Sequence, residues 1–287
     1  MGIYKTTEAK ENLMALYDKK LASLNIKYDE QYVSSKYGKT HIISAGEPAK
    51  QKVVILHGIN AGAPMTLEAI TGLLSDYNLI VIDTLGQTTK SDEVRLPVKD
   101  NSYGLWLTDV FEKLGIKNAP VIGVSYGGFL LQRLIAVAPQ KVTKAIFVVP
   151  GGFANGPLLK SMKQLSLPLM RFMFTKSDKS LAKFLSAFYH NIQDDDLQFH
   201  RNTLLGVKMD YRKPPLAKHQ EMKNYNGKVY IMGADNDIFF PAESSIEKCK
   251  NIFRNFQADH LIKNTKHFPH QEKFKEINDK IKEWLKA

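Results

Sequence analysis

Cysteine, arginine and long hydrophobic runs are all scarce in this sequence of 287 residues. The single cysteine, Cys249, cannot form an intramolecular disulfide, so we expect a reducing compartment and a cytoplasmic protein. No stretch approaches the roughly 20 apolar residues of a membrane-spanning helix. Residues 1–8 lack the apolar block of a secretory signal. These absences predict a protein without stable membrane insertion.

The formal net charge is +11, and it comes from lysine far more than from arginine. Nucleic-acid binders usually cluster arginine and aromatic residues on one element, whereas the six arginines here are dispersed along the chain. The pattern therefore predicts a lysine-rich solvated surface and no nucleic-acid partner. It is also compatible with a preference for acidic substrates or acidic surfaces.

Apolar runs alternate with helical patterns through most of the chain, which is typical of an α/β fold. An amphipathic helix at 9–24 and a hairpin at 28–45 precede this alternation. Expected strands follow at 53–56, 79–82, 121–124, 145–149, 229–232 and 261–263, and expected helices at 64–74, 103–114, 241–256 and 271–285. Short, wholly apolar strands separated by helices predict a mostly parallel central sheet of about eight strands flanked by helices. Such a chain is expected to be a monomer or dimer.

The alternation stops after Pro150 and resumes near residue 227, with helical segments and prolines between. We therefore expect a core formed by residues 1–150 and 227–287, and a helical cap over residues 151–226. The run Leu165–Phe174 is apolar and aromatic. It is interpreted either as a buried helix face or as the lining of an acyl pocket or an interfacial lid.

The pentapeptide Gly123-Val124-Ser125-Tyr126-Gly127 has the form G-x-S-x-G and lies between an expected strand and an expected helix. A serine at a sharp strand-to-helix turn adopts a strained backbone, and the flanking glycines allow neighbouring backbone to pass close by. The motif predicts that the Ser125 hydroxyl is exposed at the sheet edge as a nucleophile. A serine nucleophile needs an imidazole to accept its proton and a carboxylate to orient that imidazole.

Two candidate carboxylates follow the expected strand at 229–232, namely Asp235 and Asp237. Asp237 stands four residues before Pro241, where the next helix is expected to start, and we favour it as the acid. Asp235 is interpreted as a turn residue that caps its own backbone. Both remain candidates at this stage.

Two candidate bases follow the next strand, His267 and His270. His267 comes directly after the strand-end loop, whereas His270 lies close to the last helix, so His267 is favoured. A metal site at these two residues is not expected, because Pro269 prevents them from sharing one helix face. A second pair, Asp196 and His200, is interpreted as a surface pair rather than a metal site.

Stabilisation of a tetrahedral oxyanion requires backbone N–H donors that are already in place. Tyr126, directly after the serine, is expected to supply one, and Ile59 in the loop after the first buried strand the other. His57 precedes the serine in the chain and is interpreted as structural, holding this loop by hydrogen bonds. Asp83 is also interpreted as structural.

In order, His57-Gly58, the serine motif, the segment 233–241 and His267 resemble the motifs of the α/β-hydrolase superfamily. The N-terminal helix and hairpin resemble those of bacterial carboxylesterase-like members. The resemblance implies a Ser125, Asp237 and His267 triad, and it argues against branches that use an aspartate nucleophile. One segment departs from the pattern: residues 83–91 lack the proline and second glycine that many relatives carry there, in a loop expected to border the pocket.

The expected activity is that of a serine hydrolase for carboxylic esters of short to medium acyl chain, without metal or organic cofactor. Lactones, thioesters, carbon–carbon bonds and acyl transfer are alternatives on the same triad. A non-catalytic binding protein on this scaffold, or a surface binder of anionic polymers or membranes, is the competing class. The side chains expected to form an apolar pocket are Phe153, Leu165, Leu169, Phe172, Phe174 and Phe188.

Overall fold

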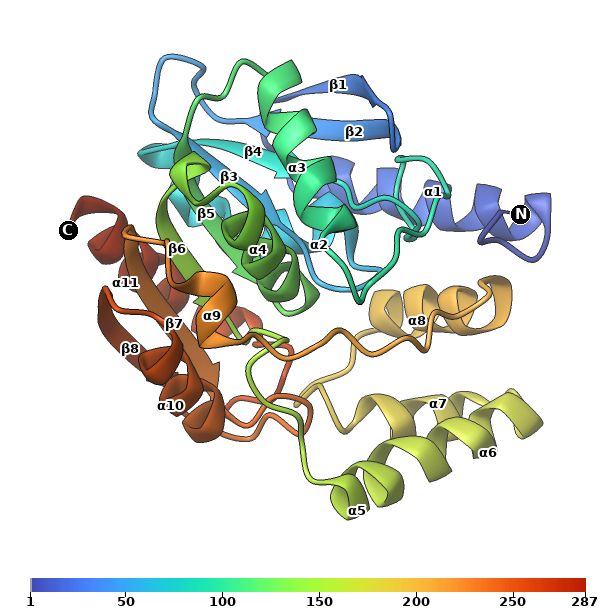
Figure 1. Cartoon of the computed structure of the whole chain (residues 1–287). Helices are drawn as coiled ribbons and strands as arrows, with labels where there is room; N and C mark the ends of the chain where they lie inside the picture. The colour runs from blue at the N-terminus through green and yellow to red at the C-terminus, as the bar shows by residue number, and fades with distance from the viewer. Residues whose placement is uncertain (1) are drawn as a thin grey trace.

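The central element of the computed structural model, which describes residues 2–287, is one eight-stranded sheet (Figure 1). The strand order is β1-β2-β4-β3-β5-β6-β7-β8. β2 runs antiparallel to both β1 and β4, and all neighbours from β4 to β8 are parallel. This confirms the expected mostly parallel sheet. The strands are β1 Tyr28–Ser35, β2 Gly38–Ala45, β3 Lys52–Leu56, β4 Asn78–Ile82, β5 Ala119–Val124, β6 Val142–Val148, β7 Lys228–Ala234 and β8 Phe256–Ile262.

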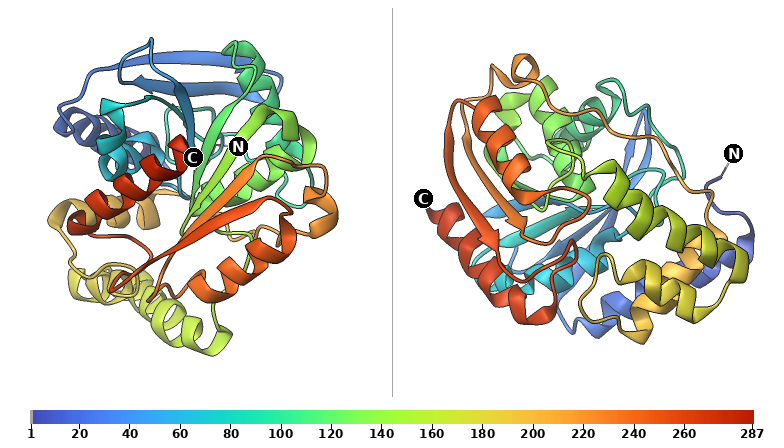
Figure 2. Two further views of the ribbon diagram at one scale, coloured as in Figure 1. Left: turned by 90° about the vertical axis from the view of Figure 1, so that its left-hand side faces the viewer. Right: turned by 90° about the horizontal axis from the view of Figure 1, so that it is seen from below.

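Helices cover both faces of the sheet and bury two separate apolar clusters (Figures 1 and 2). Alternate residues of β3 divide between them: Val54 and Leu56 face α3, α4 and α10, whereas Val53 and Ile55 face α1, α2 and α11. Strands buried on both faces read as continuous apolar runs, which is why the sequence located them. These helices are α1 Thr7–Ser23, α2 Gly62–Ile70, α3 Ser102–Lys113, α4 Tyr126–Val137, α10 Ala242–Ile252 and α11 Phe274–Lys286.

A helical insertion connects β6 to β7, at the lower right of Figure 1. Its described residues contain no strand of the sheet, and the helices α6, α7 and α8 enclose an apolar cluster of their own. The N-terminal segment contacts this insertion through a bridge between Tyr4 and Val207 and through α1 against α8. The cap boundaries at 151 and 226 stay a prediction. The inserted helices are α5 Leu158–Ser161, α6 Leu167–Thr175, α7 Asp178–Leu185, α8 Asp194–Gly206 and α9 His219–Met222, with a π-helical segment at Met162–Ser166 between α5 and α6.

Three short 3₁₀ helices complete the secondary structure of the described residues, at Thr71–Ser75, Pro139–Lys141 and Gln271–Lys273. Within residues 2–287, no helix combines the length and the apolar character needed to cross a bilayer.

The last strand is where the sequence prediction was wrong. The expected helix 241–256 ends at Ile252, and the expected strand 261–263 is the end of the longer β8. β8 lies at the edge of the sheet and is only partly buried along most of its length. An edge strand with polar residues such as Gln257 and Asp259 lacks the wholly apolar run that marks buried strands.

Candidate active site

Ser125 lies at the turn between β5 and α4 with backbone angles φ 51° and ψ −115°. A positive φ is strained for a residue with a side chain. Three backbone hydrogen bonds hold this conformation: the Ser125 N–H donates to Val148 O, and the Ser125 carbonyl accepts from the N–H groups of Gly128 and Gly151. The side chain is nearly buried and its hydroxyl borders two cavities. The turn thus fixes one hydroxyl at the carboxyl end of the sheet.

The two glycines of the motif are required by close backbone contacts. A Cβ at Gly123 would lie 2.5 Å from the carbonyl oxygen of Gly127. A Cβ at Gly127 would lie 2.0 Å from the carbonyl oxygen of Leu56 on the neighbouring strand. Both distances are far below van der Waals contact, so any larger residue would displace α4 from the sheet and move Ser125 with it.

The imidazole of His267 connects the serine to a carboxylate. Its Nε2 lies 2.9 Å from Ser125 Oγ, and its Nδ1 lies 2.7 Å from Asp237 Oδ2. A carboxylate oxygen only accepts, so Nδ1 carries the hydrogen and donates it to Asp237. In the neutral ring Nε2 is then the acceptor for the serine hydroxyl. The sequence-predicted Ser125, His267 and Asp237 are therefore brought together from the ends of three strands.

The two aspartates after β7 have different partners. The second carboxylate oxygen of Asp237 accepts the N–H groups of Phe239 and Phe240 at 2.8 and 3.1 Å. Asp235 instead accepts the N–H groups of Asn264 and Thr265. Burial would raise the pKa of Asp235, but these backbone donors outweigh it and the pKa is lowered. Asp235 thus orders the turn before His267, whereas Asp237 contacts the ring itself.

The alternative base, His270, does not reach the serine. Its Nε2 lies 3.4 Å from Glu272 Oε2, and its ring packs edge-on against His190. His267 is enclosed by aromatic rings, with Phe239, Phe240 and Phe268 at centroid distances of 5.2, 5.5 and 5.2 Å. Such an apolar surround strengthens hydrogen bonds among the three polar side chains.

The two residues predicted to donate backbone N–H groups to an oxyanion, Tyr126 and Ile59, line the same cavity as Ser125. Tyr126 is the first residue of α4, so its N–H has no acceptor within the helix. Ile59 follows β3 and borders the same cavity as Ser125 and Tyr126. The helix N-terminus adds a favourable dipole for negative charge at this position.

A second histidine–carboxylate cluster stabilises the loop that carries Ile59. His57 Nδ1 donates to Gly58 O at 2.7 Å, and its Nε2 accepts the N–H of Thr84 at 2.8 Å. These two bonds confirm the structural interpretation of His57. Burial lowers the pKa of His57, so the ring stays neutral in this position.

Asp83 is the centre of that cluster. Its carboxylate accepts from His41 Nδ1 and Tyr17 at 2.9 and 2.8 Å, and from the N–H of Ala63 at the start of α2. Burial alone would raise the pKa of Asp83, yet the hydrogen bond from His41, with the help of Tyr17, lowers it overall. Asp83 thereby ties α1, β2 and α2 to the loop that carries Ile59.

The segment 83–91 has a different role from the predicted one. None of its described residues lines either cavity at Ser125. Gln87 Oε1 instead accepts the Asn60 N–H at 2.7 Å, and the Thr88 hydroxyl donates to Asn60 O at 2.8 Å. These two side chains stabilise the loop after β3. Gln87 and Thr88 were not identified from the sequence. The segment departs from the family pattern, and no local sequence signal indicates that these side chains contact Asn60.

The larger cavity, of about 320 Å³, lies between the sheet and the helices α7 and α8. Its lining is mainly apolar, and Arg212 supplies a cationic side chain. The aromatic and aliphatic lining residues are Ile59, Tyr126, Phe129, Phe184, Phe188, Phe199, Leu204, Met209, Phe239, Phe240 and Phe268.

Only Phe188 of the six predicted pocket residues lines this cavity, so the other five predictions were wrong. Phe153 packs in the sheet core against Phe147, and Phe172 is buried in the cluster formed by α6 and α7. Leu165 and Leu169 pack against that cluster, and Phe174 is exposed. Helical spacing identifies an apolar face, but it cannot say which neighbour the face contacts.

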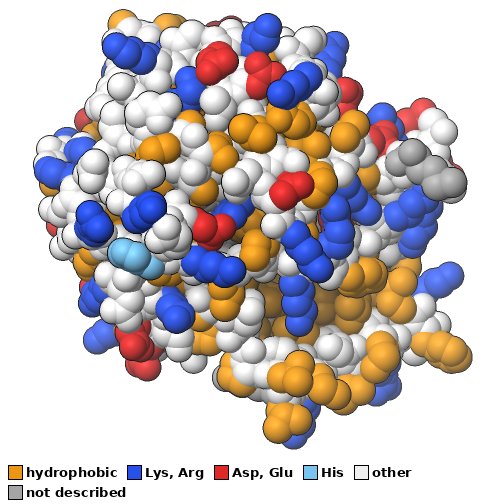
Figure 3. All heavy atoms as spheres, viewed as in Figure 1, with side chains coloured by type: hydrophobic (Ala, Val, Ile, Leu, Met, Phe, Trp, Pro, Cys, Tyr) orange, Lys and Arg blue, Asp and Glu red, His pale blue; other side chains and the backbone are white. Residues whose placement is uncertain are grey.

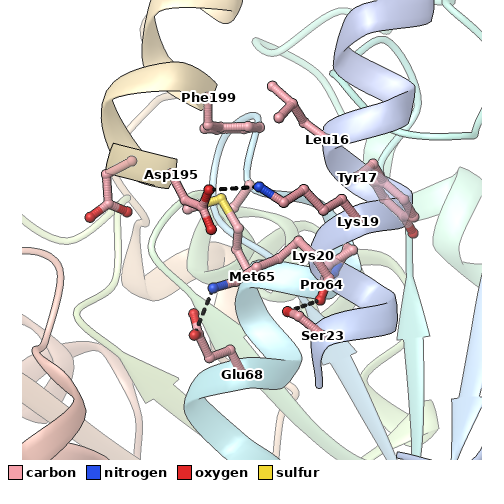
Figure 4. A pocket seen from close by; sticks show the side chains of 12 residues that line it. Leu16, Tyr17, Lys19, Lys20, Ser23, Pro64, Met65, Glu68, Asp195 and Phe199 are labelled. Atoms are coloured by element: carbon pink, nitrogen blue, oxygen red, sulfur yellow. Dashed lines mark hydrogen bonds and ion pairs between the residues drawn. The ribbon is translucent and has the colours of Figure 1, made fainter. Parts of the chain in front are cut away.

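A smaller cavity of about 130 Å³ adjoins Ser125 and His267 on the side of α2 and α11. It shares Met65, Glu68 and Asp196 with a surface pocket between α1, α2 and α8 (Figure 4). Figure 4 shows ion pairs from Lys19 and Lys20 across that pocket, with Met65 between them. The serine therefore faces a large chamber on one side and a small one on the other.

Asp196 and His200 are not the surface pair predicted from their spacing, because each borders one of the two chambers. His200 Nε2 lies 2.9 Å from the hydroxyl of Tyr189, and burial lowers the pKa of His200 to about 4. Burial also raises the pKa of Asp196. Among the described residues, no group of three or more His, Cys, Asp or Glu side chains is placed to hold a metal ion.

Comparison with known proteins places the chain in a family. Carboxylesterase YbfK of Bacillus subtilis (strain 168) is 22% identical over 283 residues, covering 94% of this chain and 92% of that protein. The crystal structure of naproxen esterase (carboxylesterase NP) from Bacillus subtilis superposes with a TM-score of 0.84 at 19% identity, covering 98% of this chain and 99% of that one. The family described as alpha/beta hydrolase fold matches residues 52–218, more than half of the sequence. The chain belongs to the alpha/beta hydrolase fold family.

Proposed function

We propose that the chain is a serine hydrolase that cleaves carboxylic esters through Ser125, His267 and Asp237. The observation that carries this proposal is the 2.9 Å contact from Ser125 Oγ to a ring whose other nitrogen contacts Asp237 at 2.7 Å. Two proteins similar to this chain along nearly its whole length are named carboxylesterases, which supports the same reaction class.

In the proposed reaction, His267 Nε2 accepts the hydroxyl proton as Ser125 Oγ bonds to the ester carbonyl carbon. The carbonyl oxygen becomes an oxyanion between the N–H groups of Ile59 and Tyr126. The protonated ring then donates its proton to the departing alkoxide, and the alcohol leaves an acyl group on the serine. Water transfers a proton to His267 and attacks the acyl carbon, and the ring returns that proton to Ser125 Oγ as the carboxylic acid leaves.

The two chambers define the proposed substrate. An ester whose carbonyl sits at Ser125 has one side in the apolar chamber of about 320 Å³ and the other in the chamber of about 130 Å³. We therefore propose esters with one short to medium apolar chain and one small group. The partner is a small molecule, and the single, buried Cys249 fits a protein of the cytoplasm.

Hydrolysis of p-nitrophenyl esters from acetate to decanoate tests the proposal, with wild type and Ser125→Ala measured side by side. We expect turnover by wild type with a maximum at short or medium chains, and loss of at least about 10⁴-fold in Ser125→Ala. Equal rates for the two proteins would overturn it.

A further inference from the structure

One face of the inserted helices is exposed and apolar. The run from α5 through the π-helical segment to α6 packs onto α7 with Phe172 on its inner side. Its opposite side, named here the outer cap face, is open to solvent, with Phe174 93% and Leu159 81% exposed. The residues of the outer cap face are Leu158, Leu159, Met162, Leu167, Met170, Met173 and Phe174. Exposed apolar groups of this extent usually mark an interaction surface.

The π-helical segment keeps this face continuous. Met162 and Leu167 are five residues apart, and the segment Met162–Ser166 spans that interval. A π-helical turn has more residues than an α-helical one, so it places both residues on one side of the run. Regular α-helical spacing would turn Leu167 and the residues after it away from Leu158 and Met162.

Basic side chains accompany the apolar ones. Residues 157–185 contain five lysines, one arginine and one acid, Asp178, which pairs with Arg201. Lys163, Arg171 and Lys176 are exposed beside the outer cap face. Figure 3 shows hydrophobic side chains at the lower edge of this region, with basic ones among them and a hollow lined by hydrophobic side chains above.

We propose that the outer cap face docks onto the surface of an anionic lipid bilayer. A helix with protruding leucine, methionine and phenylalanine and a basic border matches the amphipathic helices that lie in a membrane interface. The lysines and the arginine complement anionic headgroups. A second copy of the chain on this face would bring the basic borders together and repel. The proposed docking depends on the outer cap face alone. It is independent of the proposed ester hydrolysis, because binding to a bilayer requires no reaction at Ser125.

Vesicle co-sedimentation tests the docking with the full chain carrying Ser125→Ala, so that no lipid is consumed. Vesicles of equal parts phosphatidylglycerol and phosphatidylcholine are compared with phosphatidylcholine alone. We expect binding to the mixed vesicles, and a reduction of about tenfold or more with phosphatidylcholine alone. Replacing Leu159, Met170 and Phe174 together by serine is expected to reduce binding to the mixed vesicles by at least about tenfold. These residues are exposed, so the fold should remain.

A matched control replaces three exposed apolar residues elsewhere, Tyr32→Ser, Val94→Ser and Leu105→Ser, and should bind like the parent. Charge is tested by Lys163→Glu, Arg171→Glu and Lys176→Glu, which we expect to abolish the preference for phosphatidylglycerol. Failure of the parent to sediment with mixed vesicles, or equal loss in the control, would overturn the proposal. So would a dimer seen by light scattering that the serine variant of the outer cap face dissociates.

Discussion

The buried pairs His267–Asp237 and His41–Asp83 differ in what the second nitrogen of the histidine ring contacts. His267 gives one nitrogen to Asp237 and the other to the hydroxyl of Ser125. His41 gives one nitrogen to Asp83 and the other to Glu30 Oε1 at 3.1 Å. Because both of these partners are carboxylates, neither nitrogen of His41 contacts a hydroxyl whose proton it could accept.

The two pairs contain the same residue types, so the difference between them lies in their surroundings. His267 borders two cavities together with Ser125, so a substrate can reach the hydroxyl that contacts its second nitrogen. The pair at His41 is enclosed by α1, β2 and α2, and its hydrogen bonds hold the loop that carries Ile59. We infer that one pair transfers protons and the other maintains structure, and the following predictions test that difference.

The largest expected effect is the contrast between His267→Ala and His41→Ala. His267→Ala removes the proposed proton acceptor, so ester turnover should fall by about 10⁴-fold or more. His41→Ala removes a hydrogen-bond donor from buried Asp83 and should lower the free energy of unfolding by about 3 kcal/mol. Turnover and denaturant unfolding, measured on both variants, check this. The comparison fails if folded His41→Ala protein loses turnover to the same extent as His267→Ala.

The aspartates after β7 give the next contrast. Asp237→Asn should lower kcat by about 10⁴-fold, because an amide can favour the wrong ring tautomer of His267. Asp235→Asn is the matched control, since its amide oxygen still accepts one of the two N–H groups of Asn264 and Thr265 and Asp237 is untouched, and its kcat should stay within a few fold of wild type. A large loss of kcat in Asp235→Asn would mean that the role of orienting His267 had been assigned to the wrong carboxylate.

A smaller effect is expected at the proposed oxyanion donor. Ile59→Pro removes the backbone N–H and should lower kcat by about 10²- to 10³-fold. Ile59→Ala keeps the N–H and changes only a half-exposed side chain, so kcat should remain close to wild type. Steady-state kinetics with one p-nitrophenyl ester separates them. Equal kcat values would remove Ile59 from the mechanism.

The smallest expected effect concerns pH and the structural cluster. Burial lowers the pKa of His57 below 6.5. Below that pH, His57 therefore binds a proton in the unfolded chain but not in the folded chain. This residue therefore contributes a loss of stability as the pH falls from 6.5 toward its folded pKa. His57→Gln can keep both hydrogen bonds without titrating, so its thermal midpoint should fall less between pH 7 and 5. Parallel curves for the two proteins would contradict this.

The features that could be predicted from the sequence are those that depend on neighbouring residues. The turn at Ser125, the loop residues Asp237 and His267 and the buried strands each carry a signal within a few neighbouring residues. The structural cluster carries none, because Tyr17 and His41 reach Asp83 from 66 and 42 residues away. Their association depends on tertiary packing, so no spacing rule could have joined them.

The cavity lining was the least predictable part of the site. Helical periodicity marked Phe172 and Phe174 as part of an apolar segment, but α6 packs on α7 and leaves Phe174 exposed. The residues that do line the large chamber include Phe184 and Phe199, which lie on α7 and α8. Which face of a helix contacts a neighbour is decided by helix packing, and a single sequence does not encode it in a readable pattern.

The central claim is that His267 activates Ser125 while the cluster at Asp83 only supports it. The most direct test is the intact mass of the protein, with peptide mapping, after brief exposure to a fluorophosphonate. We predict one adduct, on Ser125, in wild type and in Asp83→Asn protein that remains folded. We predict no adduct in Ser125→Ala and much slower formation of the adduct in His267→Ala. An unmodified wild type, or an adduct on a residue other than Ser125, would contradict the account.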